Sequence, residues 1–197
     1  MALEQLAEIV AEIHPYVTKL HLREKQKTAQ DLYQTINLLT KANVPLSKIV
    51  INDRVDVAIA TGASAVQLAW HSLDVAVVKA NFPLLAVGCS IHSFEEGVRA
   101  QQKRADYLVY GHIFPTHSKL GRKPKGIEQL KKITEFLAIP VIAIGGILPE
   151  NAKQVIQTGA KGIAVMSGIF DADDPIAAVT AYKNVIENGD GESGKGF

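Results

Sequence analysis

Hydrophobic and polar positions along this chain follow two alternating patterns. Short, nearly continuous apolar runs are separated by longer segments in which apolar residues return every three or four positions. The first pattern is typical of strands buried on both faces, and the second of amphipathic helices. The sequence therefore predicts strands and helices in alternation, which favours an α/β fold built on a parallel sheet.

The apolar runs predict seven strands. The first surrounds Leu20 and Leu22, and the others span residues 49–52, 65–68, 84–90, 107–111, 141–145 and 162–167. A helix comes before all of them, because Leu3, Leu6 and Val10 repeat at helical spacing. We predict a (β/α)8 TIM barrel whose first strand is missing from this chain. Three explanations stay open: the sheet is unusual at its start, the strand is absent from this chain, or an adjoining segment fills the gap.

Local signals mark where several helices begin and end. Thr28 and Asp31 fit an N-cap with an acidic first turn, and Ser93 with Glu96 fits a capping box. The segment from Pro149 to Gly159 has proline at its start and glycine after its end, as helices often do. A last helix is predicted from Pro175 to Ile186.

Length and composition describe one ordinary globular domain. The chain has 197 residues, of which 47% are hydrophobic and 21% charged. We predict a single barrel domain over residues 1–187, followed by a polar, disordered tail over residues 188–197. A single cysteine, Cys89, excludes an internal disulfide and the usual zinc clusters.

The charge balance bears on possible partners. The net charge of +1 gives no reason to expect nucleic acid or an anionic membrane as a partner. No secretory leader and no membrane-spanning apolar run is present in the sequence, so we expect a cytoplasmic protein. A homo-oligomer is possible.

Polar residues gather after the predicted strands, which in a parallel barrel lie on the catalytic face. Arg23 and Lys25 follow the first strand, Asn52 the second, and Ser90 the fourth. The fifth ends in the segment Gly111-His112-Ile113-Phe114-Pro115-Thr116-His117-Ser118-Lys119. So many polar strand ends predict a ligand site, and the histidine can transfer protons near neutral pH.

Glycines follow the last two predicted strands. Gly145-Gly146 comes directly after one, and Ser167-Gly168 after the other. Glycine lets the backbone approach a ligand closely, and successive peptide N–H groups can hold a phosphate. We therefore predict a phosphate site on these two loops, the recurrent position in phosphate-binding barrels.

These residues resemble a known family. The segment from Gly111 to Lys119 resembles the G-x-I-F-P-T-x-[ST]-K segment of thiamine phosphate synthases, and residues 142–147 and 165–169 are similar to their phosphate loops. Residues 20–25 and 51–54 are similar as well, and the likeness extends to about Tyr182. The chain is identified as a member of the thiamine phosphate synthase superfamily.

Two departures bear on which member it resembles. His112 stands where the synthases have proline, as in the thiazole tautomerases (TenI-type proteins). Ser72 stands where the synthases have a carboxylate that helps to hold Mg²⁺, and serine is a poor substitute. The resemblance thus implies an isomerase of thiamine biosynthesis, which converts the non-aromatic ylidene tautomer of carboxythiazole phosphate into the aromatic thiazole. Such a reaction needs neither a metal nor a cofactor, and its partner is this small molecule alone.

The resemblance and the polar strand ends together give the expected site. His112 is expected to act as general acid and base. The expected substrate-binding residues are Arg23, Lys25, Asn52, Ser90, Thr116, Ser118, Lys119, Gly146, Ser167 and Gly168. Two alternatives remain. One is thiamine phosphate synthase, a Mg²⁺-dependent transferase that joins a pyrimidine pyrophosphate to the thiazole phosphate, with Asp53 as one metal ligand. The other is a non-catalytic, ligand-binding regulator.

Overall fold

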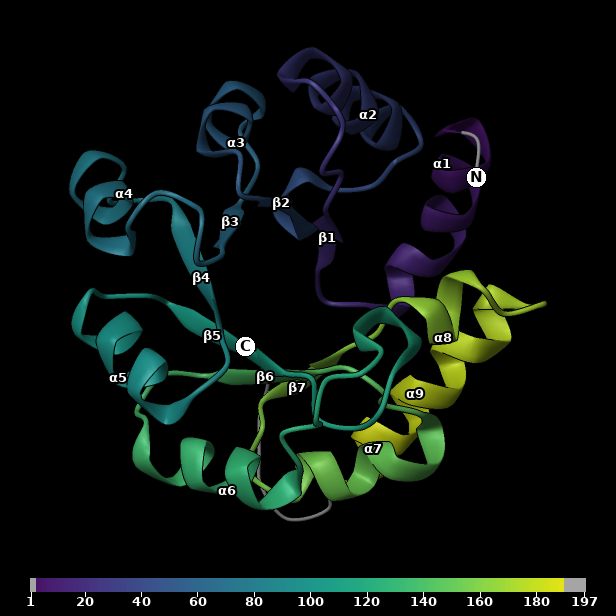
Figure 1. Cartoon of the computed structure of the whole chain (residues 1–197). Coiled ribbons are helices and arrows are strands. Elements are labelled where there is room, and N and C mark those ends of the chain that lie inside the picture. The colour runs from purple at the N-terminus through teal and green to yellow at the C-terminus, as the bar shows by residue number, and fades with distance from the viewer. Residues whose placement is uncertain (1–2, 190–197) are drawn as a thin grey trace. The chain divides into compact units, whose positions relative to one another are not determined.

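The computed structural model describes residues 3–189, in which strands and helices alternate along the chain (Figure 1). The described residues contain seven strands, as the apolar runs predict. The chain divides into two compact units. Unit 1 extends to Ser90 and includes Lys103–Asp106, and unit 2 comprises Ile91–Gln102 and the chain from Tyr107 onward.

Unit 1 carries the first strands in parallel order. Its elements are α1 (Leu3–Ile13), η1 (His14–Tyr16), β1 (Leu20–Leu22), α2 (Ala29–Lys41), η2 (Leu46–Lys48), β2 (Ile49–Asn52), α3 (Val55–Thr61), β3 (Ala65–Leu68), α4 (Val75–Asn81) and β4 (Ala86–Ile91), which ends at the unit boundary. β1 pairs with β2, β2 with β3, and β3 with β4, all in parallel. The register aligns Asn52 with Gln67, so their side chains point to the same side of the sheet.

Unit 2 repeats the pattern. Its elements are α5 (Phe94–Gln102), β5 (Tyr107–Gly111), η3 (His117–Lys119), α6 (Ile127–Phe136), β6 (Val141–Ile144), α7 (Pro149–Ile156), β7 (Gly162–Ala164), α8 (Ser167–Phe170) and α9 (Pro175–Gly189). β6 pairs in parallel with β5 and with β7, and the register aligns Gly111 with Ile144 and Ile144 with Ala164. The ends of these strands therefore lie at the same edge of the sheet.

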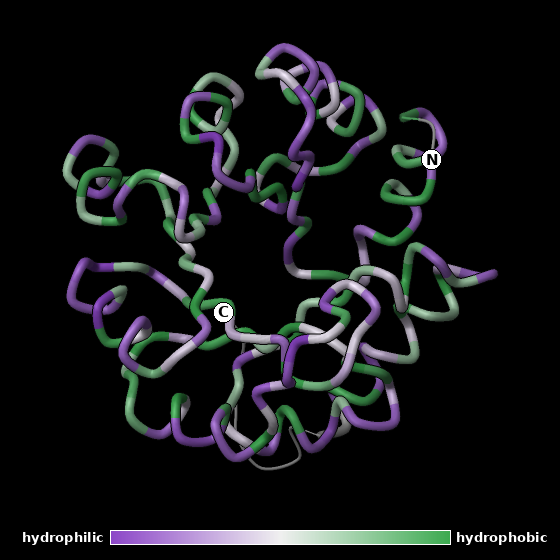
Figure 2. Tube along the Cα trace, in the orientation of Figure 1, coloured by the Kyte–Doolittle hydropathy of each residue, from purple (hydrophilic) through white to green (hydrophobic). Residues whose placement is uncertain are grey.

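Burial follows the hydrophobic pattern. The β2 residues Ile49, Val50 and Ile51 are fully buried, as are Leu108 of β5 and Leu130 of α6. Colour alternates between hydrophobic and hydrophilic along the helices in Figure 2, as expected for helices with one buried face. Apolar strands packed under amphipathic helices thus form the core of each unit.

The predicted helix starts are confirmed, whereas some strand ends are shifted. Thr28 caps α2 in a full capping box with Asp31, and α7 begins at Pro149. β7 ends at Ala164 instead of residue 167, because Ser167 already begins α8. α9 continues to Gly189, beyond the predicted domain end at residue 187, and residues 190–197 of the predicted tail lie outside the described residues. Within residues 3–189, no helix has the length and apolarity needed to cross a membrane.

Candidate functional site

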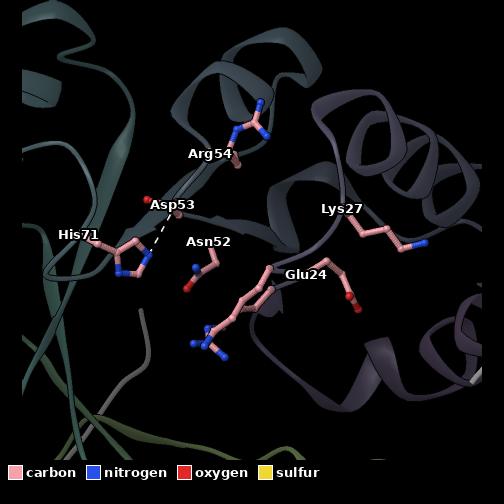
Figure 3. Close-up of a pocket in the computed structure, with 8 residues that line it drawn as sticks. Glu24, Lys27, Asn52, Asp53, Arg54 and His71 are labelled. Atoms are coloured by element: carbon pink, nitrogen blue, oxygen red, sulfur yellow. Dashed lines mark ion pairs between the residues drawn. The ribbon is translucent and has the colours of Figure 1, made fainter.

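A polar pocket lies in unit 1 where the parallel strands end (Figure 3). It has a volume of about 330 Å³. The residues that line it follow β1, β2 and β3, and they are Arg23, Glu24, Lys25, Lys27, Asn52, Asp53, Arg54 and His71. Carboxyl ends of parallel strands meet at one edge of a sheet, which explains why residues so far apart in the sequence come together here.

The charge of this pocket favours an anion. Four lining residues are cationic and two are carboxylates, so the pocket has a net charge of +2 with His71 neutral. Arg54 is paired with Asp56, and its hydrogen bonds lower the pKa of that carboxyl. Arg23 and Lys25 have no hydrogen-bond or ion-pair partner among residues 3–189. These two cations are therefore available to a ligand.

His21 adds no charge at neutral pH. Desolvation by the surrounding protein, and next the nearby Lys19, lower the pKa of His21 to about 4, although the residue keeps an exposed surface. The imidazole is therefore neutral above that pH, and the positive charge near the end of β1 comes from arginine and lysine.

One of the two pocket carboxylates faces a histidine. Asp53 Oδ2 lies 3.7 Å from His71 Nε2, and Figure 3 shows the two side chains facing each other. The neighbouring Ser72 is also engaged, since its hydroxyl oxygen accepts a hydrogen bond of 2.8 Å from the Ala69 N–H. The residues present do not fit a magnesium site, because Ser72 closes a turn where the resemblance requires a carboxylate. The described part of the chain holds no cluster of three or more His, Cys, Asp or Glu able to hold a metal ion.

A buried glutamine and a half-buried serine lie on the same side of the sheet as Asn52. Gln67 is only 3% exposed, and its Nε2 donates a hydrogen bond of 3.0 Å to the Ser90 hydroxyl oxygen. Its Oε1 has no hydrogen-bond partner. Ser90 does not line the pocket; it supports Gln67 instead. Gln67 is a polar residue at the end of the third predicted strand, but it is not among the substrate-binding residues that the sequence predicts.

In unit 2, His112 directly follows β5. Its side chain is 8% exposed, and Nε2 lies 3.2 Å from the backbone oxygen of Arg122. The peptide bond between Gly111 and His112 is cis. The backbone here is hydrogen-bonded to the next strand, because Ile113 N–H donates to Ile144 O and Phe114 N–H to Gly145 O, each at 3.0 Å. His112 is thus held where a strand ends.

The glycine turn after β6 packs against this segment. Gly145 has φ +100° and Gly146 φ +67°, a conformation that favours glycine. A Cβ on Gly145 would lie 2.3 Å from His112 Cβ, and one on Gly146 would lie 2.4 Å from Pro115 O. The structure therefore brings the predicted acid–base residue and the first predicted phosphate loop into contact.

The second predicted phosphate loop is joined to the first through α9. A Cβ on Gly168 would lie 2.3 Å from the Tyr182 hydroxyl oxygen. That hydroxyl donates a hydrogen bond of 3.1 Å to Ile147 O, next to Gly146. Ser167 and Gly168 begin α8, so their N–H groups lie at a helix start.

Thr116, Ser118 and Lys119 lie on the loop between β5 and α6. Thr116 caps η3, and its hydroxyl oxygen accepts a weak hydrogen bond of 3.4 Å from the Ser118 N–H. Ser118 and Lys119 are exposed on η3. These three predicted residues thus share one short turn. The predicted site residues lie in both units, each unit bringing together its own set.

The chain is similar to known proteins of one family. The sequence profile of the thiamine monophosphate synthase (TMP-TENI) family matches residues 2–169, which is most of the chain. The chain belongs to this family. The thiamine-phosphate synthase of Pyrococcus furiosus is 39% identical over 173 residues, which cover 86% of this chain and 83% of the relative. That of Ruminiclostridium cellulolyticum is 43% identical over 164 residues, covering 80% and 76%.

Solved structures agree on the fold of this TMP-TENI member. A thiamine phosphate pyrophosphorylase from Pyrococcus furiosus has a TM-score of 0.82 at 35% identity and covers 93% of this chain and 90% of its own. A 3-hexulose-6-phosphate synthase has a TM-score of 0.73 at 20% identity, covering 93% and 94%, and is similar in fold alone. The predicted α/β fold of the thiamine phosphate synthase type is confirmed. The names of the relatives match the transferase alternative better than the isomerase.

Proposed function

We propose that this TMP-TENI protein is an isomerase of thiamine biosynthesis that converts the ylidene tautomer of carboxythiazole phosphate to the aromatic thiazole. One observation carries the proposal: His112, a nearly buried imidazole at a strand end, packs against the Gly145-Gly146 turn. An imidazole can both accept and donate a proton near neutral pH. By resemblance, the tautomerases have histidine at position 112, where the synthases have proline.

The proposed reaction moves one proton. His112 removes a proton from a ring carbon and returns one to the exocyclic carbon, while aromatisation makes the step favourable. Positioned acid–base catalysis of this kind contributes roughly 10²–10⁴-fold in rate. The phosphate is expected on the backbone N–H groups of Gly146, Ser167 and Gly168, because glycine turns and helix starts bind anions.

Side chains supply the remaining proposed contacts. In unit 2, Thr116, Ser118 and Lys119 are proposed to bind the substrate from the η3 turn. In unit 1, Arg23 and Lys25 are proposed to bind an anionic group, since both are unpaired among residues 3–189 and arginine suits bidentate binding. Asn52 is proposed to orient a ligand directly, and Ser90 to do so through its hydrogen bond with Gln67.

The second candidate is thiamine phosphate synthase. The names of the relatives favour it, and so do Asp53 and the intact Pro115-Thr116 and Ser118-Lys119 pairs. In this reaction Mg²⁺ would bind the pyrophosphate, and Asp53 is the residue of this chain that could bind the ion. The engagement of Asp53 with His71 and of Ser72 with Ala69 argues against this candidate.

Replacement of His112 tests the proposed isomerase activity. His112→Asn should keep the protein folded and still able to bind aromatic carboxythiazole phosphate, yet lower enzymatic tautomer conversion by at least 10²-fold. Conversion is followed by NMR of the ylidene substrate, and ligand binding by calorimetry. His117→Asn is the matched control, because this exposed histidine lies on the adjacent loop. Full-speed conversion by the His112 variant would refute the mechanism.

A coupling assay separates the candidates. The wild-type protein is incubated with pyrimidine pyrophosphate and thiazole phosphate, with Mg²⁺ or with EDTA. We expect no joined product. Formation of joined product only with Mg²⁺ would establish the transferase. Ligand binding without turnover in either assay would instead establish the non-catalytic regulator.

A further inference from the structure

The environment of the His112 ring distinguishes its two nitrogens. Nε2 lies 3.2 Å from the backbone oxygen of Arg122. A carbonyl oxygen can only accept a hydrogen bond, so Nε2 must carry the proton in this contact. The neutral imidazole has a single N–H, which leaves a lone pair on Nδ1. No residue in the described range 3–189 hydrogen-bonds to Nδ1.

The loop that supplies this carbonyl is held at both ends. Lys125 N–H donates to His112 O at 2.9 Å, and Gly126 N–H donates to Ile113 O at 3.0 Å. The loop therefore leaves the strand end and returns to the same two residues. Within it, Arg122 N–H donates to Lys119 O at 3.2 Å, which orients the next peptide. The position of the Arg122 carbonyl is thus fixed by the backbone and not by a side chain.

The glycine turn after β6 packs against the Cα and Cβ of His112. His112 Cβ lies so near Gly145 that a methyl group there would clash at 2.3 Å. The Cα and Cβ of His112 are therefore held against this turn, while Nε2 is held by the Arg122 carbonyl of the β5–α6 loop. These two contacts together favour one ring orientation, because interiors are closely packed.

We propose that the Arg122 backbone carbonyl is a positioning group that holds His112 in the Nε2–H tautomer, so that Nδ1 is the atom that transfers the proton. The inference rests on the proposed isomerase activity and specifies its geometry. In histidine sites generally, the hydrogen bond that one ring nitrogen makes decides whether the other nitrogen carries a proton.

The proton balance of the step is complete. The Nδ1 lone pair takes the proton from the ring carbon, and the electron pair of the broken C–H bond moves into the heterocycle. The imidazolium keeps its Nε2–H bond to Arg122 O, which stabilises the charge. Nδ1–H then protonates the exocyclic carbon, and the imidazole returns neutral. No oxidant, metal or second reactant takes part.

Nitrogen NMR tests the tautomer directly. The full chain is labelled with ¹⁵N-histidine and its ring nitrogens are recorded in alkaline solution, where imidazoles are neutral; the His112→Asn variant assigns the signals. We expect His112 to show a protonated Nε2 and an unprotonated Nδ1. A protonated Nδ1, or an even mixture of the two tautomers, would overturn the inference.

A pair of glycine variants tests the loop. Gly121 precedes Arg122 with φ +74°, and Gly62 at the end of α3 has φ +70°; neither has an atom within 4 Å of an added Cβ. Valine disfavours this conformation equally at both sites. Gly121→Val should mix the tautomers of His112, lower kcat about tenfold within the range of acid–base catalysis and leave KM unchanged. Gly62→Val should change neither tautomer nor kcat.

The outcomes separate this inference from the function it deepens. An inactive His112→Asn variant together with a protonated Nδ1 in the wild type would refute the positioning role and keep the isomerase. An active His112→Asn variant would refute the isomerase itself. If Gly121→Val and Gly62→Val lower kcat equally, the effect of the loop variant comes from a general loss of protein stability. That result would also overturn the positioning role.

Discussion

Gln67 and His112 are both buried polar side chains, and they differ in how their hydrogen-bonding capacity is used. His112 has one nitrogen bonded to a carbonyl, whereas Gln67 keeps a buried carbonyl oxygen without a donor. Native proteins leave few such groups, and each costs about 1–3 kcal/mol when it is desolvated without a partner. The unpaired oxygen of Gln67 lies at a strand end, on the same side of the sheet as the pocket residue Asn52, and its burial costs stability.

Methionine at this position should make the protein more stable. Gln67→Met keeps the length of the side chain and removes the unpaired oxygen, which costs about 1–3 kcal/mol, but it also removes the hydrogen bond to Ser90, which contributes about 0.5–1.5 kcal/mol. We therefore expect the free energy of unfolding in urea to rise by up to about 1 kcal/mol. Thr158→Val is the contrast, because the buried Thr158 hydroxyl donates to Val155 O at 2.7 Å. That variant should lose stability. A clear loss in Gln67→Met would show that its oxygen is satisfied in solution.

The sequence identifies residues better than it identifies their partners. For His112, Gly146 and Gly168, strand-end position, residue type and resemblance coincide, so the sequence alone is enough to propose them as site residues. Arg122 is not, because its contribution is a backbone carbonyl and carries no side-chain signal. Likewise, the pairing of Asp53 with His71 depends on how loops after different strands meet, which a one-dimensional pattern does not contain.

Among the elements, α9 supports both predicted phosphate loops. Its Tyr182 donates to Ile147 O and packs against Gly168. The sequence predicts this helix from its apolar spacing but gives no reason to link it to the site. Element existence was predictable from periodicity, whereas the start of β4 and the end of β7 were not, because apolar residues extend beyond the paired residues of these strands.

A double-mutant cycle measures this support. Gly168→Ala places a methyl group against the Tyr182 hydroxyl, and such overpacking costs about 1–3 kcal/mol. Tyr182→Phe removes the hydroxyl and should cost about 1 kcal/mol through the lost hydrogen bond. Phenylalanine makes room for the methyl group. The free energy of unfolding of the double variant should therefore exceed, by about 0.5 kcal/mol or more, the value expected from adding the losses of the two single variants. If urea denaturation shows that the two single-variant losses simply add, the contact between Gly168 and the Tyr182 hydroxyl is contradicted.

On the scale of the whole molecule, the described surface carries conspicuous apolar residues. Trp70 is 89% exposed and Leu84 99%. Scattered exposed apolar residues are normal on soluble proteins, but a tryptophan that is almost fully exposed to solvent is less common. Trp70 also lies edge-on to His71 of the unit 1 pocket, with ring centroids 5.3 Å apart.

The single tryptophan reports whether this surface is covered in solution. The chain contains one Trp, so its fluorescence belongs to Trp70 alone. We expect quenching by acrylamide nearly as strong as for free tryptophan, and little change in emission wavelength on unfolding in urea. Strong protection that increases with protein concentration would mean that copies of the chain associate through this surface.

β1 bears on how the protein avoids aggregation. The strand has only three residues, Leu20–Leu22, and within unit 1 it pairs on one side alone, with β2. An open strand edge can recruit the edge of another molecule and start a growing assembly. Lys19 and Arg23 flank this short strand with positive charge, so a second copy approaching edge to edge would meet repulsion and find few backbone groups to bind.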